Sequence, residues 1–363
     1  MHVIVCGGGI IGAATAYFLA RRGVRTTVVE RTDVAAAASG KSGGFLARDW
    51  CEGTPVEALA RRSFALHAEL AAAGIGNWGY RGVVTYAGTA DFMRLAARAT
   101  PAADGPARWM SPEAQITQTL GTPGETAQVE PEALVRALIS AAVAAGATLV
   151  NGTVTAVRHD VQAVLEGVDV DGECLACDKA VLAMGPWSNL VRGVPIAPIY
   201  GVKGHSLVFQ TGTSVPAEAL FMQCRDDSGV ILSPEIFPRA NGTTYVSAIS
   251  SEPALPADAA AVLPDEDALA SLTRLCAALS PHLTPEWIVA RQACFRPMTD
   301  DGIPLIGSVP GAPGVFVGTG HSVWGILNGP ATGEALASLI VDGHGGAIDL
   351  APFDPSRLPA LPG

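Results

Sequence analysis

VIVCGGGIIGAATAYFLARRGVRTTVVER, residues 3–31, opens with a short apolar run and continues with glycines spaced as G-x-G-x-x-G. A helical pattern of apolar and small residues follows and ends at Gly23, before a second apolar run. Gly7 permits a tight turn, Gly9 lets the backbone approach a pyrophosphate, and Gly12 allows the helix to pack closely on the strand. The free N–H groups at the start of that helix favour an anion. The stretch therefore predicts a Rossmann-like strand–helix–strand unit that binds a dinucleotide.

An acidic residue, Glu30, stands at the end of the second predicted strand. Its carboxylate would accept hydrogen bonds from ribose hydroxyls and would repel a 2′-phosphate, which disfavours NADP. Ile10 and Ile11 open the predicted helix and Arg31 follows Glu30, so we expect these residues in the same site. The motif alone leaves FAD and NAD as alternatives.

The next segment, SGKSGGFL (residues 39–46), is rich in glycine and small hydroxyl residues. Such residues expose backbone N–H groups that can bind a phosphate or a ring carbonyl, whereas the alternative is a flexible Gly/Ser linker. The cofactor-binding residues predicted here are Ser39, Lys41, Ser42, Gly43, Gly44, Phe45 and Leu46.

This segment resembles the one that wraps the pyrophosphate and the flavin ring in the D-amino-acid-oxidase-like (DAO) superfamily of FAD-dependent enzymes. QVEPEALVRALISAAVAAGATLVNGTVTAV, KAVLAMGPWSNLV and GVFVGTGHSVWGILNGPATGEALASLI resemble the same superfamily in the same order. The resemblance implies FAD as the cofactor and a backbone contact from Val154 to its adenine. It also implies positions near FAD for Gly185 and Trp187, and positions against the flavin pyrimidine for Gly320, His321, Gly325, Ile326 and Leu327.

Within the superfamily the chain resembles glycine oxidase, sarcosine oxidase and a eukaryotic branch of FAD-dependent oxidoreductases without an assigned substrate. GGFLARDW and GHSVWGILNGPATG are most similar to that last branch. The implied reaction oxidises the C–N bond of a small amine or amino acid. A hydride passes to the flavin, the imine hydrolyses, and oxygen or another acceptor reoxidises the flavin, giving H2O2 where the acceptor is oxygen.

The stretch QACFRPMTDDGIPLIG contains a cysteine and an arginine two residues apart. Arg296 matches the arginine that grips the substrate carboxylate in glycine oxidase, and the planar guanidinium suits that task. The alternative for Arg296 is an ordinary salt bridge. Cys294 matches the segment through which sarcosine oxidases tether FAD by a thioether, so FAD is either covalently bound there or packed beside a small buried thiol.

One departure from the oxidase pattern follows the Gly-His pair, where glycine and sarcosine oxidases carry a basic residue. Here Ser322 and Val323 lead to Trp324, which we expect to form an apolar wall of the substrate site together with the catalytic candidate His321. The substrate could therefore lack a carboxylate, or the electron acceptor could differ from oxygen. Arg48 is a further catalytic candidate facing the ring, with a solvated or acid-paired arginine as the alternative.

The predicted fold is α/β, with a discontinuous Rossmann-like FAD-binding domain and a second α+β domain built on a mainly antiparallel sheet. Residues 1–78, 128–190 and 290–363 are expected to form the FAD-binding domain, and residues 79–127 and 191–289 the substrate domain. Asn241-Gly242 between two β-rich runs predicts a hairpin turn in the second domain.

Composition narrows the possible functions further. The formal net charge is −11 and no cluster of basic residues occurs, which argues against binding to nucleic acid. The scattered cysteines predict neither a disulfide framework nor a metal site. No targeting segment or membrane span is recognised, so we expect a cytoplasmic protein. Two other functions stay open: an NAD-linked dehydrogenase, and a flavin-binding assembly factor with little turnover.

Overall fold

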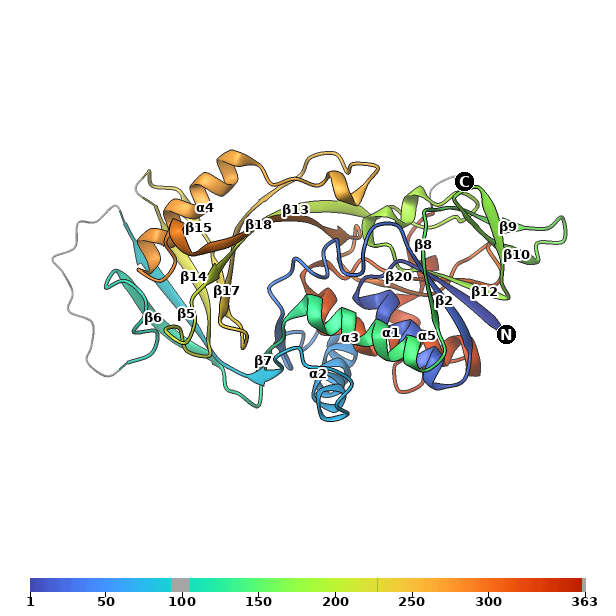
Figure 1. Cartoon of the computed structure of the whole chain (residues 1–363), viewed down its shortest axis with the longest axis horizontal. Coiled ribbons are helices and arrows are strands. Elements are labelled where there is room, and N and C mark those ends of the chain that lie inside the picture. Colours follow the sequence, from blue (N-terminus) through green and yellow to red (C-terminus); the bar gives the residue numbers. More distant parts are fainter. Residues whose placement is uncertain (93–104, 227, 361–363) are drawn as a thin grey trace.

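The computed structural model of the chain describes residues 1–92, 105–226 and 228–360. The molecule is elongated, with a parallel sheet and its helices at one end and an antiparallel sheet at the other (Figure 1). The N-terminus lies at the end that holds the parallel sheet. Among the described helices, none combines the length and the apolar character needed to cross a lipid bilayer.

The first sheet has the strand order β19-β20-β12-β1-β2-β8 in the described part of the chain. Its strands are parallel except β19, which pairs antiparallel with β20. The bounds are β1 His2–Cys6, β2 Arg25–Glu30, β8 Thr148–Asn151, β12 Lys179–Leu182, β19 Leu305–Ser308 and β20 Val315–Thr319.

The chain enters helix α1 (Ile10–Arg21) directly from β1, as the glycine spacing predicts. Gly7 has a φ of 110°, in the region that favours glycine. A Cβ at Gly12 would collide with the carbonyl oxygen of Gly7, so only glycine lets the helix start this close to the strand. Gly23, with a φ of 73°, ends the helix before β2.

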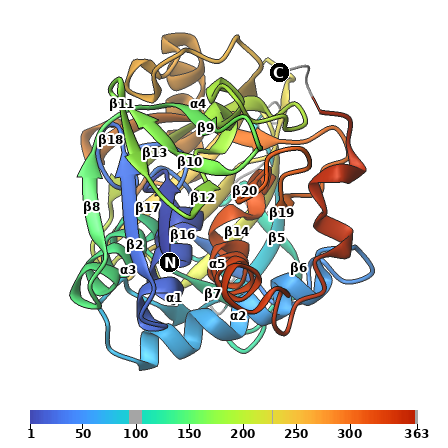
Figure 2. The same ribbon diagram turned by 90° about the vertical axis from the view of Figure 1, so that its right-hand side faces the viewer.

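Helices cover one face of the parallel sheet and a small antiparallel sheet covers the other (Figure 2). Helix α1 packs against both α3 and α5, and α5 packs on α2. A Cβ at Gly333 of α5 would lie 2.5 Å from the backbone of Ala14, so α1 and α5 are in close contact. These elements are α2 Glu57–Ala72, α3 Pro131–Ala144, α5 Gly325–Asp342, β9 Val154–His159, β10 Leu165–Val170 and β11 Glu173–Ala176.

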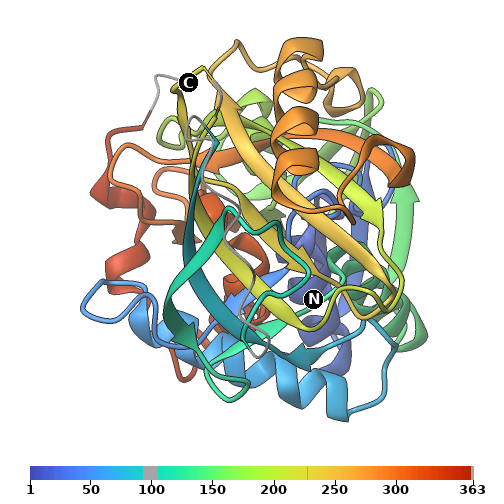
Figure 3. The same ribbon diagram turned by 90° about the vertical axis from the view of Figure 1, so that its left-hand side faces the viewer.

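The second sheet has the order β18-β13-β17-β16-β14-β5-β6 in the described residues, with β15 paired to β14. Its pairs are antiparallel except β5 with β14. Helix α4 (Glu266–Leu279) lies across its outer face and contacts β13 and β17 (Figure 3). The strands are β5 Val84–Asp91, β6 Ala114–Gly121, β13 Tyr200–Gln210, β14 Glu218–Arg225, β15 Ile231–Leu232, β16 Glu235–Pro238, β17 Thr243–Ser251 and β18 Ile288–Met298.

Short elements complete the chain between the two sheets and at its C-terminal end. A small sheet is formed by β3 (Phe45–Ala47), β7 (Thr126–Gln128) and β4 (Arg81–Gly82). Short 3-10 helices are η1 Gly185–Leu190, η2 Ala259–Ala261, η3 Pro285–Trp287, η4 Ser322–Trp324, η5 Ala351–Phe353 and η6 Pro355–Arg357.

The predicted α/β fold with a mainly antiparallel second sheet is confirmed. The hairpin at Asn241-Gly242 also forms: Gly242 has a φ of 79°, and the turn joins the antiparallel pair β16 and β17. The domain bounds given above stay a prediction. Residues 93–104 of the predicted segment 79–127, residue 227 of the predicted segment 191–289, and residues 361–363 lie outside the described part of the chain.

A buried histidine fixes the start of α5 from the side of α2. The Nε2–H group of His67 donates to the carbonyl oxygens of Ile326 (3.0 Å) and Leu327 (3.2 Å). Because carbonyls only accept, Nε2 carries the proton and Nδ1 is unprotonated. Burial lowers the pKa of His67 to about 4, so the ring stays neutral at physiological pH.

We predict that His67 makes folding sensitive to mild acid. An unfolded histidine titrates at about 6.5, above the folded pKa, so stability is complete above about pH 6.5 and declines as pH falls towards 4. The titration of His67 should lower the free energy of unfolding by about 2 kcal/mol at about pH 5, relative to neutral pH. Urea unfolding at about pH 7.5 and about pH 5 should show a smaller pH dependence for His67→Gln than for the wild type. The exposed His344→Gln variant should keep the wild-type dependence, and equal dependence in all three proteins would contradict the prediction.

Candidate active site

A cavity lies between the two sheets and is lined by residues from both. The parallel-sheet side contributes the start of α1, the end of β2, the segment 35–45, η1 and the start of α5. The other side contributes residues of β13, β14, β16, β17 and β18. The cavity therefore joins the predicted dinucleotide site to the predicted substrate side.

The start of α1 offers backbone N–H groups at one end of the cavity. Gly9 caps this helix without a side-chain hydrogen bond, and the Ile10 N–H donates to Ser39 Oγ at 3.0 Å. Glu30 is held in place because its Oε2 accepts from the Gly8 N–H at 2.7 Å and its Oε1 from the Thr32 N–H at 3.0 Å. A helix N-terminus next to a fixed carboxylate suits a pyrophosphate followed by a ribose.

The glycine-rich segment is held against the antiparallel sheet. Arg239 donates from Nη2 to the Ser42 carbonyl at 2.8 Å, and its guanidinium lies 5.4 Å from the centre of the Tyr245 ring. A Cβ at Gly43 would lie 2.5 Å from the Phe237 ring, and Gly44 has a φ of 81°. Glycine is therefore required at both positions for the segment to follow the cavity wall.

The start of α5 forms a second polar wall without a charged side chain. Trp324 caps the helix with no side-chain hydrogen bond, and Ser322, just before it, has a φ of 51°. His321 Nε2 lies 2.9 Å from Thr332 Oγ1, and burial lowers its pKa to about 3, so the ring is neutral. The positive potential here comes from the helix N–H groups.

These features fit FAD as the cofactor. Two helix N-termini, those of α1 and α5, open on one cavity, where they can face a pyrophosphate and the carbonyl edge of a flavin. The intervening wall is built from glycines that no larger residue could replace. Glu30 lies where an adenosine ribose would follow the pyrophosphate.

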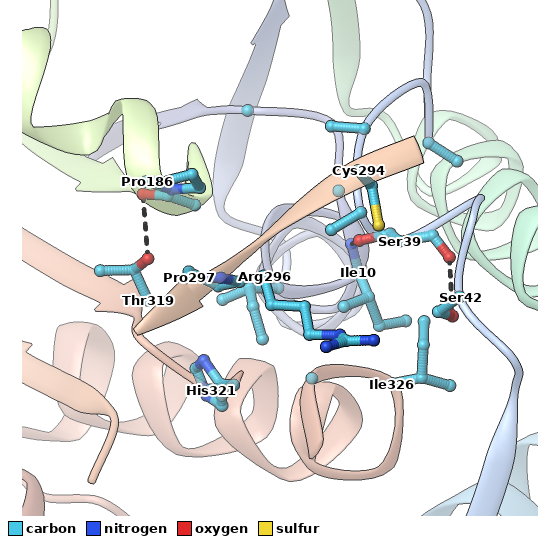
Figure 4. Close-up of a pocket in the computed structure, with 18 of the residues that line it drawn as sticks. Ile10, Ser39, Ser42, Pro186, Cys294, Arg296, Pro297, Thr319, His321 and Ile326 are labelled. Atoms are coloured by element: carbon cyan, nitrogen blue, oxygen red, sulfur yellow. Dashed lines mark hydrogen bonds between the residues drawn. The ribbon is translucent and has the colours of Figure 1, made fainter. Parts of the chain in front are cut away.

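Cys294 and Arg296 extend from one side of β18 into the cavity, between the start of α1 and the start of α5 (Figure 4). Arg296 Nη1 donates to Ser250 Oγ at 3.0 Å, and no carboxylate of the described residues lies within ion-pair distance. Burial raises the pKa of the Cys294 thiol, although the positive charges of Arg296 and Lys41 oppose this. Trp187 packs behind the strand on Phe295, with ring centres 6.4 Å apart.

Most of the residues predicted from sequence line this one cavity. They are Gly7, Gly9, Ile10, Ile11, Glu30, Arg31, Ser39, Ser42, Gly43, Gly44, Phe45, Val154, Gly185, Trp187, Cys294, Arg296, His321, Trp324, Gly325 and Ile326. Those that do not line it are Gly12, Lys41, Leu46, Arg48, Gly320 and Leu327.

Arg48 is the catalytic candidate that the structure places elsewhere. Its Nε donates to Asp49 Oδ2 at 2.7 Å and its Nη1 to the Gly124 carbonyl at 3.1 Å. This is the acid-paired alternative considered for Arg48, so we do not include it among the proposed catalytic residues. Gly12 and the buried Leu46 and Leu327 support the walls from behind.

Glu235, Phe221 and Phe237 also line the cavity and were not predicted from the sequence. Glu235 and Phe237 are two residues apart in β16, so they lie on the same face of the strand. The only sign of this wall in the sequence is an acidic residue among apolar ones in a short predicted strand. That pattern does not show which strands lie beside it, so the sequence alone could not place Glu235 in the cavity.

Comparison with known proteins adds independent support. The family model described as FAD dependent oxidoreductase (DAO) matches residues 2–339. A protein of Schizosaccharomyces pombe with the general name oxidoreductase is 29% identical over 98% of this chain and 97% of its own. Glycine oxidase of Geobacillus kaustophilus is 28% identical over 98% of this chain and 96% of its own.

Solved structures agree in fold. The crystal structure of glycine oxidase from Geobacillus kaustophilus has a TM-score of 0.77 at 26% identity and covers 98% of both chains. The L-proline dehydrogenase of P. horikoshii has a TM-score of 0.77 at 18% identity, covering 98% of this chain and 97% of its own, which is a likeness of fold. With the family model matching nearly the whole chain around a cavity that fits FAD, this protein belongs to the DAO family of FAD-dependent oxidoreductases and is an enzyme.

Proposed function

We propose that the enzyme oxidises the C–N bond of a small amino acid to an imine and uses molecular oxygen as the electron acceptor. The observation that carries this proposal is Arg296, a guanidinium that faces the cavity without a carboxylate partner among the described residues. An arginine in this state is ready to bind the carboxylate of a ligand through two parallel hydrogen bonds.

Arg296 is oriented by the sheet and not by a counter-ion. Ser250 of β17 accepts one of its hydrogen bonds, which leaves the other N–H groups of the guanidinium for a ligand. A Cβ at Gly204 of β13 would lie 2.8 Å from its Nη2, so the glycine makes room for the side chain. A substrate carboxylate held here would place the rest of a small amino acid inside the cavity.

The remaining walls restrict the substrate and exclude water. Phe45, Phe221 and Phe237 form an aromatic group, with the rings of Phe45 and Phe237 stacked 5.2 Å apart. Trp50 and Trp324 extend this group, with ring centres 6.4 Å apart. FAD supplies the acceptor for the hydride that leaves the carbon beside the amine. We propose that the predicted cofactor-binding residues that line the cavity hold FAD, whereas Arg296 and Trp324 lie on the substrate side.

The named relatives support the choice of substrate class and acceptor. Glycine oxidases of Geobacillus kaustophilus and Pseudomonas aeruginosa, each 28% identical to this chain, align over nearly all of it. Their names specify a small amino acid and an oxidase reaction. Glycine is therefore the first substrate to test, with oxygen as acceptor.

Replacing Arg296 should weaken the use of amino acids specifically. We expect Arg296→Met to lower kcat/KM for the best small amino acid about 10- to 100-fold, mainly through KM, because a charge-assisted hydrogen-bond pair is lost. The matched control is Arg48→Met, which removes an arginine outside the cavity and should change kcat/KM by less than about threefold. Oxygen consumption over a panel of amino acids and simple amines measures both.

Two outcomes would contradict this proposal. Equal decreases of kcat/KM in Arg296→Met and Arg48→Met would show that Arg296 does not bind the substrate carboxylate, provided that both variants retain wild-type FAD content. Oxidation of simple amines in preference to every amino acid would show that the substrate lacks a carboxylate.

Cys294 allows a prediction about how FAD is held. Formation of a thioether requires the thiolate, and burial raises the pKa of this thiol, so the protonated form dominates at neutral pH. We therefore expect non-covalent FAD, which acid precipitation should release into the supernatant from both the wild type and Cys294→Ser. Flavin that stays in the wild-type pellet and leaves the Cys294→Ser pellet would establish the covalent link instead.

A further inference from the structure

Glu235 is an acidic side chain on the substrate side of the cavity. It begins β16 and pairs with Phe221 of β14 on one side and Ser247 of β17 on the other. Because side chains directly opposite each other in a sheet share a face, Glu235 lies with Phe221 and Phe237 on the wall that faces the cavity. Arg296 of β18 lines the same cavity.

The carboxylate of Glu235 has no partner within the described residues. No hydrogen bond and no ion pair satisfies it there, and the residue is half-buried. The other carboxylate that lines the cavity, Glu30, accepts hydrogen bonds from Gly8 and Thr32. An ionised carboxylate that is partly removed from water without a partner loses solvation, and a cationic ligand would compensate for that loss.

The charged and titratable groups around Glu235 leave it free to exchange a proton. Burial raises its pKa, and the positive charge of Arg296 opposes the rise. Burial raises the pKa of Tyr245 of β17 to about 12, and burial lowers the pKa of His321, elsewhere in the cavity lining, to about 3. From strand β14, the residue that lines the described cavity is the apolar Phe221. A carboxyl group with a raised pKa is suited to act as a base near neutral pH.

We propose that Glu235 binds the ammonium group of the substrate and accepts one proton from it, while Arg296 holds the substrate carboxylate. This inference rests on the proposed function and adds the substrate's ionic form to it. In the step, one N–H bond breaks and one O–H bond forms on Glu235. The ammonium becomes a neutral amine and the carboxylate becomes a neutral acid, so charge and protons balance.

The step has a chemical reason. An ammonium nitrogen has no lone pair, and the C–N bond can be oxidised only once nitrogen can donate electrons to the adjacent carbon. A small amino acid is a zwitterion at neutral pH, so it offers one charge to Arg296 and the opposite charge to Glu235. A pocket with both groups should favour zwitterions over simple amines and over hydroxy acids.

Glu235→Gln is the test, because glutamine keeps the size of the side chain and removes its charge. The ligands are 2-aminoisobutyrate, which has no hydrogen on its α-carbon and so binds without being oxidised, and its hydroxy analogue 2-hydroxyisobutyrate. Changes in the flavin absorbance of the holoenzyme report both dissociation constants. The matched control is Glu173→Gln, which removes the same charge from an exposed position on β11.

Glu235→Gln should raise the dissociation constant of 2-aminoisobutyrate about 10- to 100-fold and should change that of 2-hydroxyisobutyrate by less than about threefold. Glu173→Gln should alter neither. Anaerobic bleaching of the flavin by glycine adds a second readout, in which the rate of the Glu235→Gln variant should require higher pH than that of the wild type. Wild-type FAD content and melting temperature in the variant show that the fold is intact.

The inference is overturned if the wild type does not bind the amino ligand more tightly than the hydroxy ligand. It is also overturned if Glu235→Gln weakens both ligands equally or leaves the pH profile in place. The proposed function fails separately, if no small amino acid bleaches the wild-type flavin. Selective loss of 2-aminoisobutyrate binding in Glu235→Gln would still support the ammonium site in that case.

Discussion

The close approach of β1 and α1 at Gly7 and Gly12 is the constraint on which the site depends. A side chain at Gly12 would collide with the Gly7 carbonyl, so the helix can begin at the end of the strand only with glycine at this position. That start directs the first N–H groups of α1 towards the cavity. Helix α5 packs on α1 through Gly333, so the position of α1 also helps to place the second helix N-terminus.

The elements on the cofactor side of the cavity could be predicted from short stretches of sequence. The turn at Gly7, the helix that follows it and the position of Glu30 at the end of β2 depend on residues close together in the chain, and each formed as predicted. The substrate side depends on pairing across the antiparallel sheet. Glu235 reaches the cavity because β16 lies between β14 and β17, strands that no local pattern could align with it.

The two candidate arginines differ in whether local sequence determines their position. Arg296 could be placed because a strand alternates its faces, and Cys294 and Arg296 had to share one. Arg48 is followed directly by Asp49, which binds it at 2.7 Å and keeps it outside the cavity. An acidic residue next to an arginine in the sequence favours an ion pair between them. For Arg48 this local pattern was a better guide than its position after the predicted flavin-wrapping segment.

The groups that line the cavity differ in whether their protonation state is fixed at physiological pH. The helix N-termini supply positive potential that does not titrate. His321 stays neutral because burial lowers its pKa to about 3, and Tyr245 stays neutral because burial raises its pKa to about 12. Arg296 is a permanent cation. Among these groups of the described cavity, Glu235 is the carboxylic acid whose pKa burial raises. This is why we propose Glu235, and not His321 or Tyr245, as the group that accepts the proton that an ammonium must lose before its C–N bond can be oxidised.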